Sequence, residues 1–164
     1  MKASTQPVPP GFHTVTPTIT VRNGAQAIEF YKKALGAEER MRMAGPDGKI
    51  SHAELKIGDS IIFLTEENPA MGCKSPQTLG GTSGGFYLYV EDVDRAFQRA
   101  VDAGGKVTMP VTDMFWGDRF GSFVDPYGQT WSLSTHTQDM TEQETEEGAK
   151  AFYAQMAEMQ KKSA

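Results

Sequence analysis

The sequence contains few of the residues that usually identify a chemistry. Its single cysteine, Cys73, cannot form an intrachain disulfide, and only its identity would support a role as a nucleophile. The three histidines, His13, His52 and His136, follow no spacing that specifies a metal site. The longest apolar runs, such as residues 61–64, are far shorter than the roughly 20 residues of a membrane-spanning helix, and no cleavable signal segment is evident. These absences predict a soluble, cytoplasmic protein.

Basic residues are also too few for a nucleic-acid partner. The 16 lysines and arginines are outnumbered by 21 aspartates and glutamates, which gives a formal net charge of -5. A surface that binds by neutralising phosphates is not expected at this balance. We therefore expect neither a nucleic-acid nor a membrane partner. The 164 residues are enough for one domain, which at this size buries roughly 70% of the surface of its unfolded chain.

The first half of the chain predicts a βαβββ module over residues 14–66. Residues 1–13 are rich in proline and are expected to form a flexible lead-in. Strict alternation over residues 15–21 predicts a strand that starts near Thr14, with Val15 on its buried face. Asn23 is then expected to cap a helix over residues 25–35, which Gly36 ends. Strands are predicted near residues 39–43, 50–57 and 60–65.

The second half repeats this order over residues 85–136. After a loop rich in Gly, Ser and Pro at residues 66–84, we expect a strand, a helix that Asp92 caps, and three further strands near residues 106–109, 119–124 and 130–134. The predicted fold class is α+β: two tandem βαβββ modules that form open half-barrel sheets within one domain, residues 14–136. In the remaining residues 137–164, a capping box at Thr141 predicts an appended amphipathic helix that docks on its own barrel or on a partner subunit.

The alternation also predicts which strand residues face a cavity. Each helix must cover one face of its sheet, so the apolar side of each strand meets the helix and the other side is left free. The free side carries hydroxyls, aromatics and one His/Glu pair, which suits an aromatic or moderately polar organic ligand. The residues predicted on it are Thr16, Thr18, Thr20, His52, Glu54, Lys56, Ile61, Phe63, Gly85, Tyr87, Tyr89, Thr130, Ser132 and Ser134.

Four segments together resemble one family. They are TVRNGAQAIEFYKKALGAEE, PDGKISHAELKIGDS, YLYVEDVDRAFQRAVDAGG and FWGDRFGSFVDPYGQTWSLSTH, and they span about residues 14–136. They are similar to the vicinal oxygen chelate superfamily of glyoxalases, bleomycin resistance proteins and dioxygenases, and most of all to its PhnB-like subgroup. The resemblance implies paired βαβββ modules that form open barrels, often completed by a homodimer.

The resemblance also implies a divalent ion held by His or Glu from the first and last strands of each module. Aligning the local motifs puts Thr16, Phe63, Gly85 and Ser132 at these positions. Phe and Gly have no side-chain donor, and neutral hydroxyls are poor substitutes for imidazole or carboxylate. We therefore expect no metal at these positions and no other cofactor.

Several residues remain candidates for function. His52 and Glu54 share a strand face and could act as a base with an orienting carboxylate, or as ligands of a displaced metal, or simply as a polar pair. In a loop before a strand, Arg119 could clamp a carboxylate or phosphate beside Trp116. Alternatively, Asp118 and Arg119 could pair with each other or with backbone to hold the loop, with Trp116 packed beneath. Tyr87 and Tyr89 could stack on a planar ligand or fill the barrel.

The leading hypothesis is a metal-independent protein that binds a small molecule through Thr16, Thr18, Phe63, Tyr87, Tyr89, Trp116, Arg119 and Ser132. One alternative is an enzyme, such as a lyase, an isomerase or a phosphonate-related activity, that uses His52 and Glu54 with or without a non-standard metal. A second alternative is a structural or regulatory dimer without a ligand.

Overall fold

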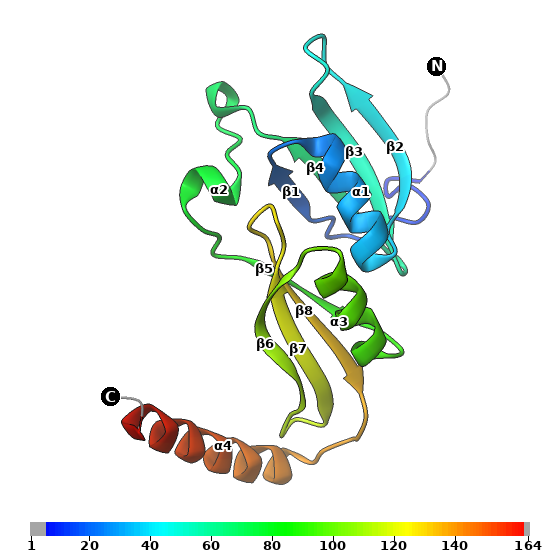
Figure 1. Ribbon diagram of the computed structural model, residues 1–164. Helices are drawn as coiled ribbons and strands as arrows, with labels where there is room; N and C mark the ends of the chain where they lie inside the picture. The colour runs from blue at the N-terminus through cyan, green and yellow to red at the C-terminus, as the bar shows by residue number, and fades with distance from the viewer. Residues whose placement is uncertain (1–5, 163–164) are drawn as a thin grey trace.

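The structure is a computed structural model that describes residues 6–162 (Figure 1). The predicted lead-in therefore lies partly outside the described residues. The elements in chain order are β1 (Thr18–Val21), α1 (Gly24–Leu35), β2 (Glu38–Ala44), β3 (Ile50–Ile57), β4 (Ser60–Glu66), η1 (Pro69–Met71), α2 (Pro76–Leu79), β5 (Gly85–Tyr89), α3 (Val93–Asp102), β6 (Lys106–Asp113), β7 (Asp118–Val124), β8 (Thr130–His136) and α4 (Glu142–Lys162).

The strands form two separate sheets with the same topology. The orders are β1-β4-β3-β2 and β5-β8-β7-β6, and in each sheet the first and last strands of the module run parallel. The registers also correspond: Thr18 pairs with Phe63, and adding 69 to both numbers gives Tyr87 and Ser132, which pair in the same way. The predicted α+β fold with two βαβββ modules is therefore confirmed, and neither sheet closes into a barrel.

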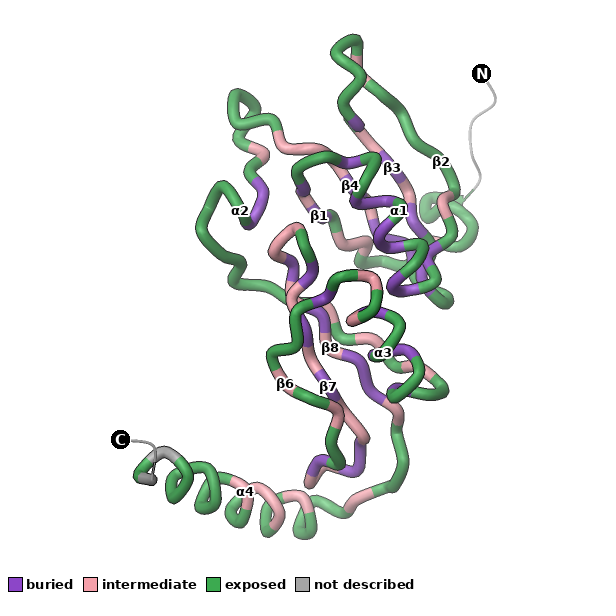
Figure 2. The backbone as a smooth tube through the Cα atoms, in the orientation of Figure 1, coloured by how far each residue is buried: buried purple, intermediate pink, exposed green. Residues whose placement is uncertain are grey.

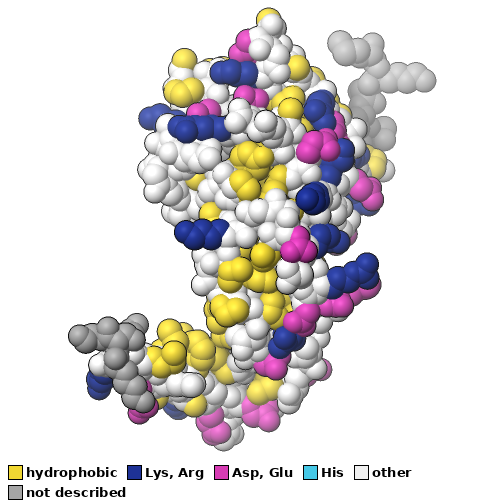
Figure 3. All heavy atoms as spheres, viewed as in Figure 1, with side chains coloured by type: hydrophobic (Ala, Val, Ile, Leu, Met, Phe, Trp, Pro, Cys, Tyr) yellow, Lys and Arg dark blue, Asp and Glu magenta, His cyan; other side chains and the backbone are white. Residues whose placement is uncertain are grey.

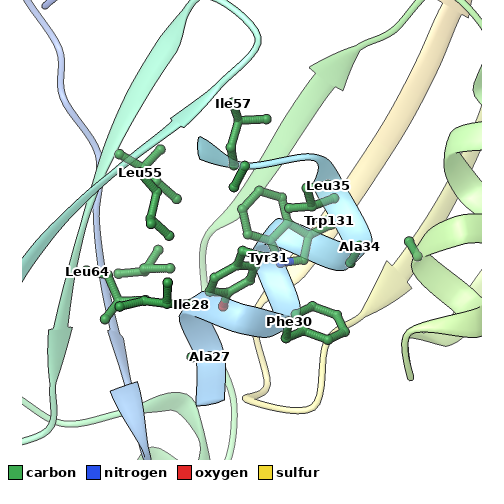
Figure 4. Close-up of a cluster of buried hydrophobic side chains, with 14 of the residues drawn as sticks. Ala27, Ile28, Phe30, Tyr31, Ala34, Leu35, Leu55, Ile57, Leu64 and Trp131 are labelled. Carbon is green, nitrogen blue, oxygen red and sulfur yellow. The ribbon is translucent and has the colours of Figure 1, made fainter. Parts of the chain in front are cut away.

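The helices cover one face of each sheet and meet each other between the modules. Helices α1 and α3 are in contact, and buried residues gather along α1 and the strands it covers and along β7 and β8 (Figures 1 and 2). At the junction, Tyr31 of α1 lies against Trp131 of β8, with ring centroids 5.5 Å apart (Figure 4). Phe86 stacks on Trp131 at 4.6 Å. One continuous apolar core therefore joins the two modules.

A buried carboxylate also holds the two modules together. Asp125, at the turn after β7, accepts hydrogen bonds from the Tyr31 hydroxyl at 2.7 Å and from Trp131 Nε1 at 2.8 Å. The backbone N–H groups of Tyr127 and Gln129 donate to its other oxygen at 2.8 and 2.9 Å. Burial raises the pKa of Asp125, while these hydrogen bonds act in the opposite direction. Each oxygen of the carboxylate therefore accepts two hydrogen bonds.

The first strand begins later than its alternation predicted. β1 starts at Thr18, Thr16 precedes it, and the Val15 side chain, expected on the buried face, is 77% exposed. Pro17 explains the difference, because it has no N–H for the ladder and restricts the residue before it. Its carbonyl still accepts a hydrogen bond from Phe63 N at 2.8 Å, so the pairing of β1 with β4 ends there.

The predicted helix caps had mixed outcomes. Asp92 accepts from Arg95 N at the start of α3, and Thr141 forms the capping box at the start of α4, both as predicted. The cap at Asn23 was wrong: this residue has a φ of 55° and its side chain makes no capping hydrogen bond. Glu66, from the end of β4, accepts from Gly24 N at 3.0 Å instead. The first turn of α1 is therefore capped by a carboxylate 42 residues away in sequence and not by the side chain of Asn23.

Two segments contain more regular secondary structure than predicted. The loop at residues 66–84 contains η1 and α2, and β6 continues past Met109 to Asp113. It passes through Pro110 at a register shift, which is compatible with proline because β6 is the edge strand of its sheet.

Helix α4 extends away from the second sheet (Figure 1). It docks through Phe115, which lies 5.6 Å from Phe152 between ring centroids and leaves room only for a glycine at position 148. Hydrophobic side chains gather over α4 (Figure 3). Tyr153 and Met156 of this helix are exposed. Among residues 6–162, no helix is both long and apolar enough to cross a membrane.

Candidate functional site

Each sheet leaves the face opposite its helix open. Of the strand residues assigned to the helix side, Ala53, Leu55, Trp131 and Leu133 are buried, and Phe86 and Leu88 are partly buried against the core. His52, Glu54, Tyr87 and Tyr89 lie on the free faces. The two modules contact each other mainly through α1 and α3, so their free faces do not enclose a common cavity within one chain. The predicted facing residues are therefore distributed over two open surfaces.

On the first sheet, the structure brings His52, Glu54 and Phe63 together. His52 Nε2 lies 3.9 Å from Glu54 Oε1, which is too long for an orienting hydrogen bond, and the imidazole lies edge-on to Phe63 at 4.8 Å. Glu54 also faces Arg40, with 3.5 Å between Oε2 and Nη1. Phe12 covers part of this surface, because its ring lies 5.8 Å from Phe63 and beneath the Arg40 guanidinium.

On the second sheet, aromatic rings form a continuous row. Tyr87 and Tyr89 lie on β5, an edge strand of the sheet, and are 45% and 68% exposed. Tyr87 stacks on Phe120 with 5.6 Å between centroids, and Trp116 meets the other side of Phe120 edge-on at 5.7 Å. Phe115 lies against Trp116 at 4.9 Å and so links the row to α4. Within the row, the rings of Tyr87 and Phe120 are nearly parallel, at 27°, and offer apolar faces of the kind that planar molecules stack on.

A buried carboxylate lies behind the tyrosines. Asp118 is only 2% exposed, and its Oδ2 accepts hydrogen bonds from the hydroxyls of Tyr87, Tyr89 and Ser134 at 3.1, 3.2 and 3.0 Å. Its Oδ1 accepts from His136 Nδ1 at 2.7 Å. Burial by itself would raise the pKa of Asp118, but the hydrogen bonds, from His136 first of all, together hold it below its usual value. The carboxylate is therefore ionised at neutral pH.

The imidazole of His136 lies between two carboxylates. Its Nε2 is 3.0 Å from Asp139 Oδ1, while Nδ1 is held by Asp118. The hydrogen bonds with Asp139 and Asp118 raise the pKa of His136, which favours the imidazolium. The pairing of Asp118 with His136 was not among the predictions from the sequence. The DPYG turn contained the signal, because counting outward from that turn along β7 and β8 places the two residues opposite each other.

Arg119 is held by acidic residues. Its Nε and Nη2 donate to Asp94 at 2.7 and 2.8 Å, and its Nη1 donates to Asp113 at 3.1 Å. These bonds raise the pKa of the guanidinium. Arg119 does not pair with Asp118, as the loop-holding alternative expected, but ties β7 to Asp94 of α3 and to Asp113 of β6. Asp118 and Arg119 also belong to β7 and not to the loop before it.

The residues at the family's metal positions do not fit a divalent ion. The alignment puts Thr16, Phe63, Gly85 and Ser132 at these positions, and the strand register places Thr18 beside Phe63 and Tyr87 beside Ser132. None of these six residues has an imidazole or a carboxylate. Within residues 6–162 there is also no group of three or more His, Cys, Asp or Glu arranged to hold a metal.

A groove of about 710 Å³ adjoins the tyrosines. It runs along β5 between the two modules, and Tyr87 and Tyr89 form part of its wall. The turn at residues 58–60 contributes from the first module, and Arg95 and Arg99 contribute from α3. The second sheet therefore combines an aromatic surface with an adjoining recess of a size typical for small-molecule sites.

Comparison with known proteins identifies relatives over most of the chain. The model of the Glyoxalase/Bleomycin resistance protein/Dioxygenase superfamily matches residues 11–133. An uncharacterized protein of Mycobacterium tuberculosis is 46% identical over 122 residues, which cover 73% of this chain and 72% of that protein.

Solved structures share the fold at lower identity. A PhnB protein from Bacillus cereus has a TM-score of 0.58 at 18% identity, covering 75% of this chain and 99% of the other. The fosfomycin resistance protein FosX from Listeria monocytogenes, solved with Mn(II) and 1S,2S-dihydroxypropylphosphonic acid, has a TM-score of 0.58 at 20% identity, covering 80% and 94%. The predicted family resemblance is confirmed.

Proposed function

This chain belongs to the Glyoxalase/Bleomycin resistance protein/Dioxygenase superfamily, and we propose that it is a metal-independent member that binds an aromatic or moderately polar organic molecule. The observation that carries the proposal is the exposed pair Tyr87 and Tyr89. Both rings are held in place by hydrogen bonds to the buried Asp118, so a ligand meets a surface whose side chains are already ordered.

The neighbouring residues support a binding role for the same surface. Phe120 and Trp116 extend the aromatic row, and Ser132 lies beside Tyr87 in the strand register. Stacking on such rings supplies affinity, and a few hydroxyls fix orientation. Of the other predicted ligand residues, Thr18 and Phe63 lie on the free face of the first sheet, Thr16 precedes β1, and Arg119 is engaged by Asp94 and Asp113.

A thermal-shift screen of aromatic antibiotics, phosphonates and 2-oxo compounds tests the proposal. A compound that binds the folded chain must raise its melting temperature. We expect an aromatic compound to do so, Tyr87→Ala to abolish the shift, and Tyr153→Ala, which truncates an equally large exposed tyrosine on α4, to leave it unchanged. A stoichiometric divalent ion that survives dialysis, detected by elemental analysis, would contradict the metal-independent assignment.

The alternative is an enzyme that uses His52 and Glu54, and their proximity on the open face of the first sheet favours it. Turnover of any compound found in the screen would be compared between the parent and His52→Ala. Unchanged turnover removes His52 from the mechanism. Absence of any ligand across all three classes would favour the structural or regulatory reading.

We also propose that the chain forms a homodimer in the cytoplasm. Both free sheet faces expose large apolar side chains, with Met41 and Met43 on the first and the tyrosines on the second. A second copy could cover these faces and enclose a cavity that one chain leaves open. Light scattering coupled to size exclusion should give twice the 17.9 kDa mass of one chain, and a monomer mass at micromolar concentration would contradict the dimer.

A further inference from the structure

The tyrosine hydroxyls of the aromatic surface on the second sheet already donate hydrogen bonds inside the protein. The hydroxyls of Tyr87, Tyr89 and Ser134 all donate to Asp118 Oδ2. A hydroxyl has one proton and two acceptor lone pairs, so each phenol oxygen that has donated still has acceptor capacity toward the open side. The two tyrosines therefore offer a ligand hydrogen-bond acceptors and π faces.

The charged groups next to these rings are negative on balance, because the His136 imidazolium lies between two carboxylates, those of Asp118 and Asp139. Asp118 is almost fully buried and its hydrogen bonds stabilise the carboxylate form. A carboxylate that accepts a hydrogen bond from a phenol makes the phenol oxygen a stronger acceptor, and its charge adds to the attraction that the nearby aromatic faces exert on a cation. Low solvent access at Asp118 reduces the screening of this charge.

The cationic side chains at this end of the sheet are already paired. Arg119 is bound by Asp94 and Asp113, and both ring nitrogens of His136 lie against carboxylates. Three of the five N–H donors of Arg119 and both ring nitrogens of His136 are engaged by carboxylates, so an anionic ligand bound there would lie against those carboxylates. The surface therefore lacks the clamp that recognition of a carboxylate or phosphonate needs.

The adjoining groove does not reverse this balance. It is lined by the guanidinium groups of Arg95 and Arg99, together with the carboxylates of Asp59, Glu91 and Asp92. Arg99 donates to the carbonyl of Ala34, which turns part of that guanidinium away from the groove.

We propose that the ligand of this surface is a flat ring system that carries a positive charge or N–H donors, and that ligands of the same shape with a negative charge are rejected. This inference rests on the proposed binding function and specifies its ligand class. The rings of Tyr87 and Tyr89 are inclined at 49° to each other, so the cation stacks on one ring and its N–H groups donate to the phenol oxygen of the other.

Two fluorescent probes of one shape test the proposal: 9-aminoacridine, which is a cation at neutral pH, and acridine-9-carboxylate. Fluorescence anisotropy titrations with the full chain should show the cation binding at least about tenfold more tightly, a difference of about 1.4 kcal/mol. Equal binding, or tighter binding of the carboxylate, would overturn the ligand class and leave the binding function standing. Binding of neither probe would overturn both.

A pair of matched variants tests whether Tyr89 produces the preference for the cationic probe. Tyr89→Phe keeps the ring and removes one phenol acceptor, so the preference for the cation should fall by about threefold or more. Tyr153→Phe makes the same chemical change at a tyrosine of similar exposure, 66% against 68%, and should leave the preference unchanged. Equal effects of the two variants, or no effect of Tyr89→Phe, would overturn the proposal. Asp118→Asn, which removes the negative charge, should also lower the preference, and a circular dichroism spectrum would verify that it folds.

Discussion

Removing the hydroxyl of Tyr31 should weaken the joint between the two modules. This hydroxyl lies in the core, and it donates to Asp125 at 2.7 Å from the opposite module. Tyr31→Phe keeps the ring contacts with Phe30, Tyr127 and Trp131 and removes only this bond. The variant therefore isolates the contribution of one buried polar contact to the stability of the whole chain.

The expected loss is about 2 kcal/mol in the free energy of unfolding, because a hydrogen bond to a charged group contributes roughly 1.5–3 kcal/mol. Three donors to Asp125 remain in the variant, so the carboxylate loses one hydrogen bond and keeps the other three. The loss should also depend on pH. Burial raises the pKa of Asp125, and removing a donor that favours its charged form raises it further. The loss is therefore full where the carboxyl is ionised and shrinks as the pH falls through the folded-state pKa.

Urea denaturation followed by tryptophan fluorescence measures the effect, since Trp131 is buried beside the altered bond. With a slope of about 2 kcal/mol per molar urea, the midpoint should fall by about 1 M. Tyr153→Phe, which alters an exposed ring, should change stability by less than about 0.5 kcal/mol. If Tyr31→Phe stayed within that same range at unchanged slope, the buried bond would contribute nothing and the reasoning would be refuted.

Three further changes test other contacts. Asp92→Ala removes the cap of α3 and should lower the unfolding free energy by about 1 kcal/mol in the same urea assay; no loss would mean that the cap is dispensable. His136→Gln should flatten the dependence of melting temperature on pH. The raised pKa of His136 adds stability that is complete below roughly pH 6.5 and is lost as the pH rises through the folded-state value, so parallel curves for both proteins would contradict it. Gly148→Val places a Cβ 2.7 Å from that of Phe115 and should undock α4, seen as faster limited proteolysis of that helix than in the control Ala154→Val.

Local patterns were sufficient for most of the fold. The alternation in SHAELKI correctly predicted that Ala53 and Leu55 are buried while His52 and Glu54 lie on the other face, because a strand places successive side chains on opposite sides. The order of elements in each half predicted the duplication, and the 69-residue offset between the Thr18 and Tyr87 pairings confirms it. The roles assigned to individual site residues, including His52 and Glu54, remain predictions.

Contacts between distant residues were harder to predict. The cap of α1 comes from Glu66 and not from Asn23, and β1 is shortened by Pro17 where alternation alone predicted a longer strand. Neither the identity of a residue nor its immediate neighbours indicates which distant carboxylate will reach an N–H group. Such pairings depend on how complete elements pack together.

The sequence by itself determined the two modules, the free face of each sheet and the absence of the usual ligands at the metal positions, since these follow from local periodicity and residue chemistry. Only the tertiary structure decided how the polar groups on those faces are used. Register across β7 and β8 set Asp118 opposite His136, and burial then made that carboxylate the acceptor for both tyrosines. The hydroxyls of Tyr87 and Tyr89 therefore donate to Asp118 within the protein and not to a ligand. The reason is that a buried charge must be hydrogen-bonded by the groups that packing brings within reach.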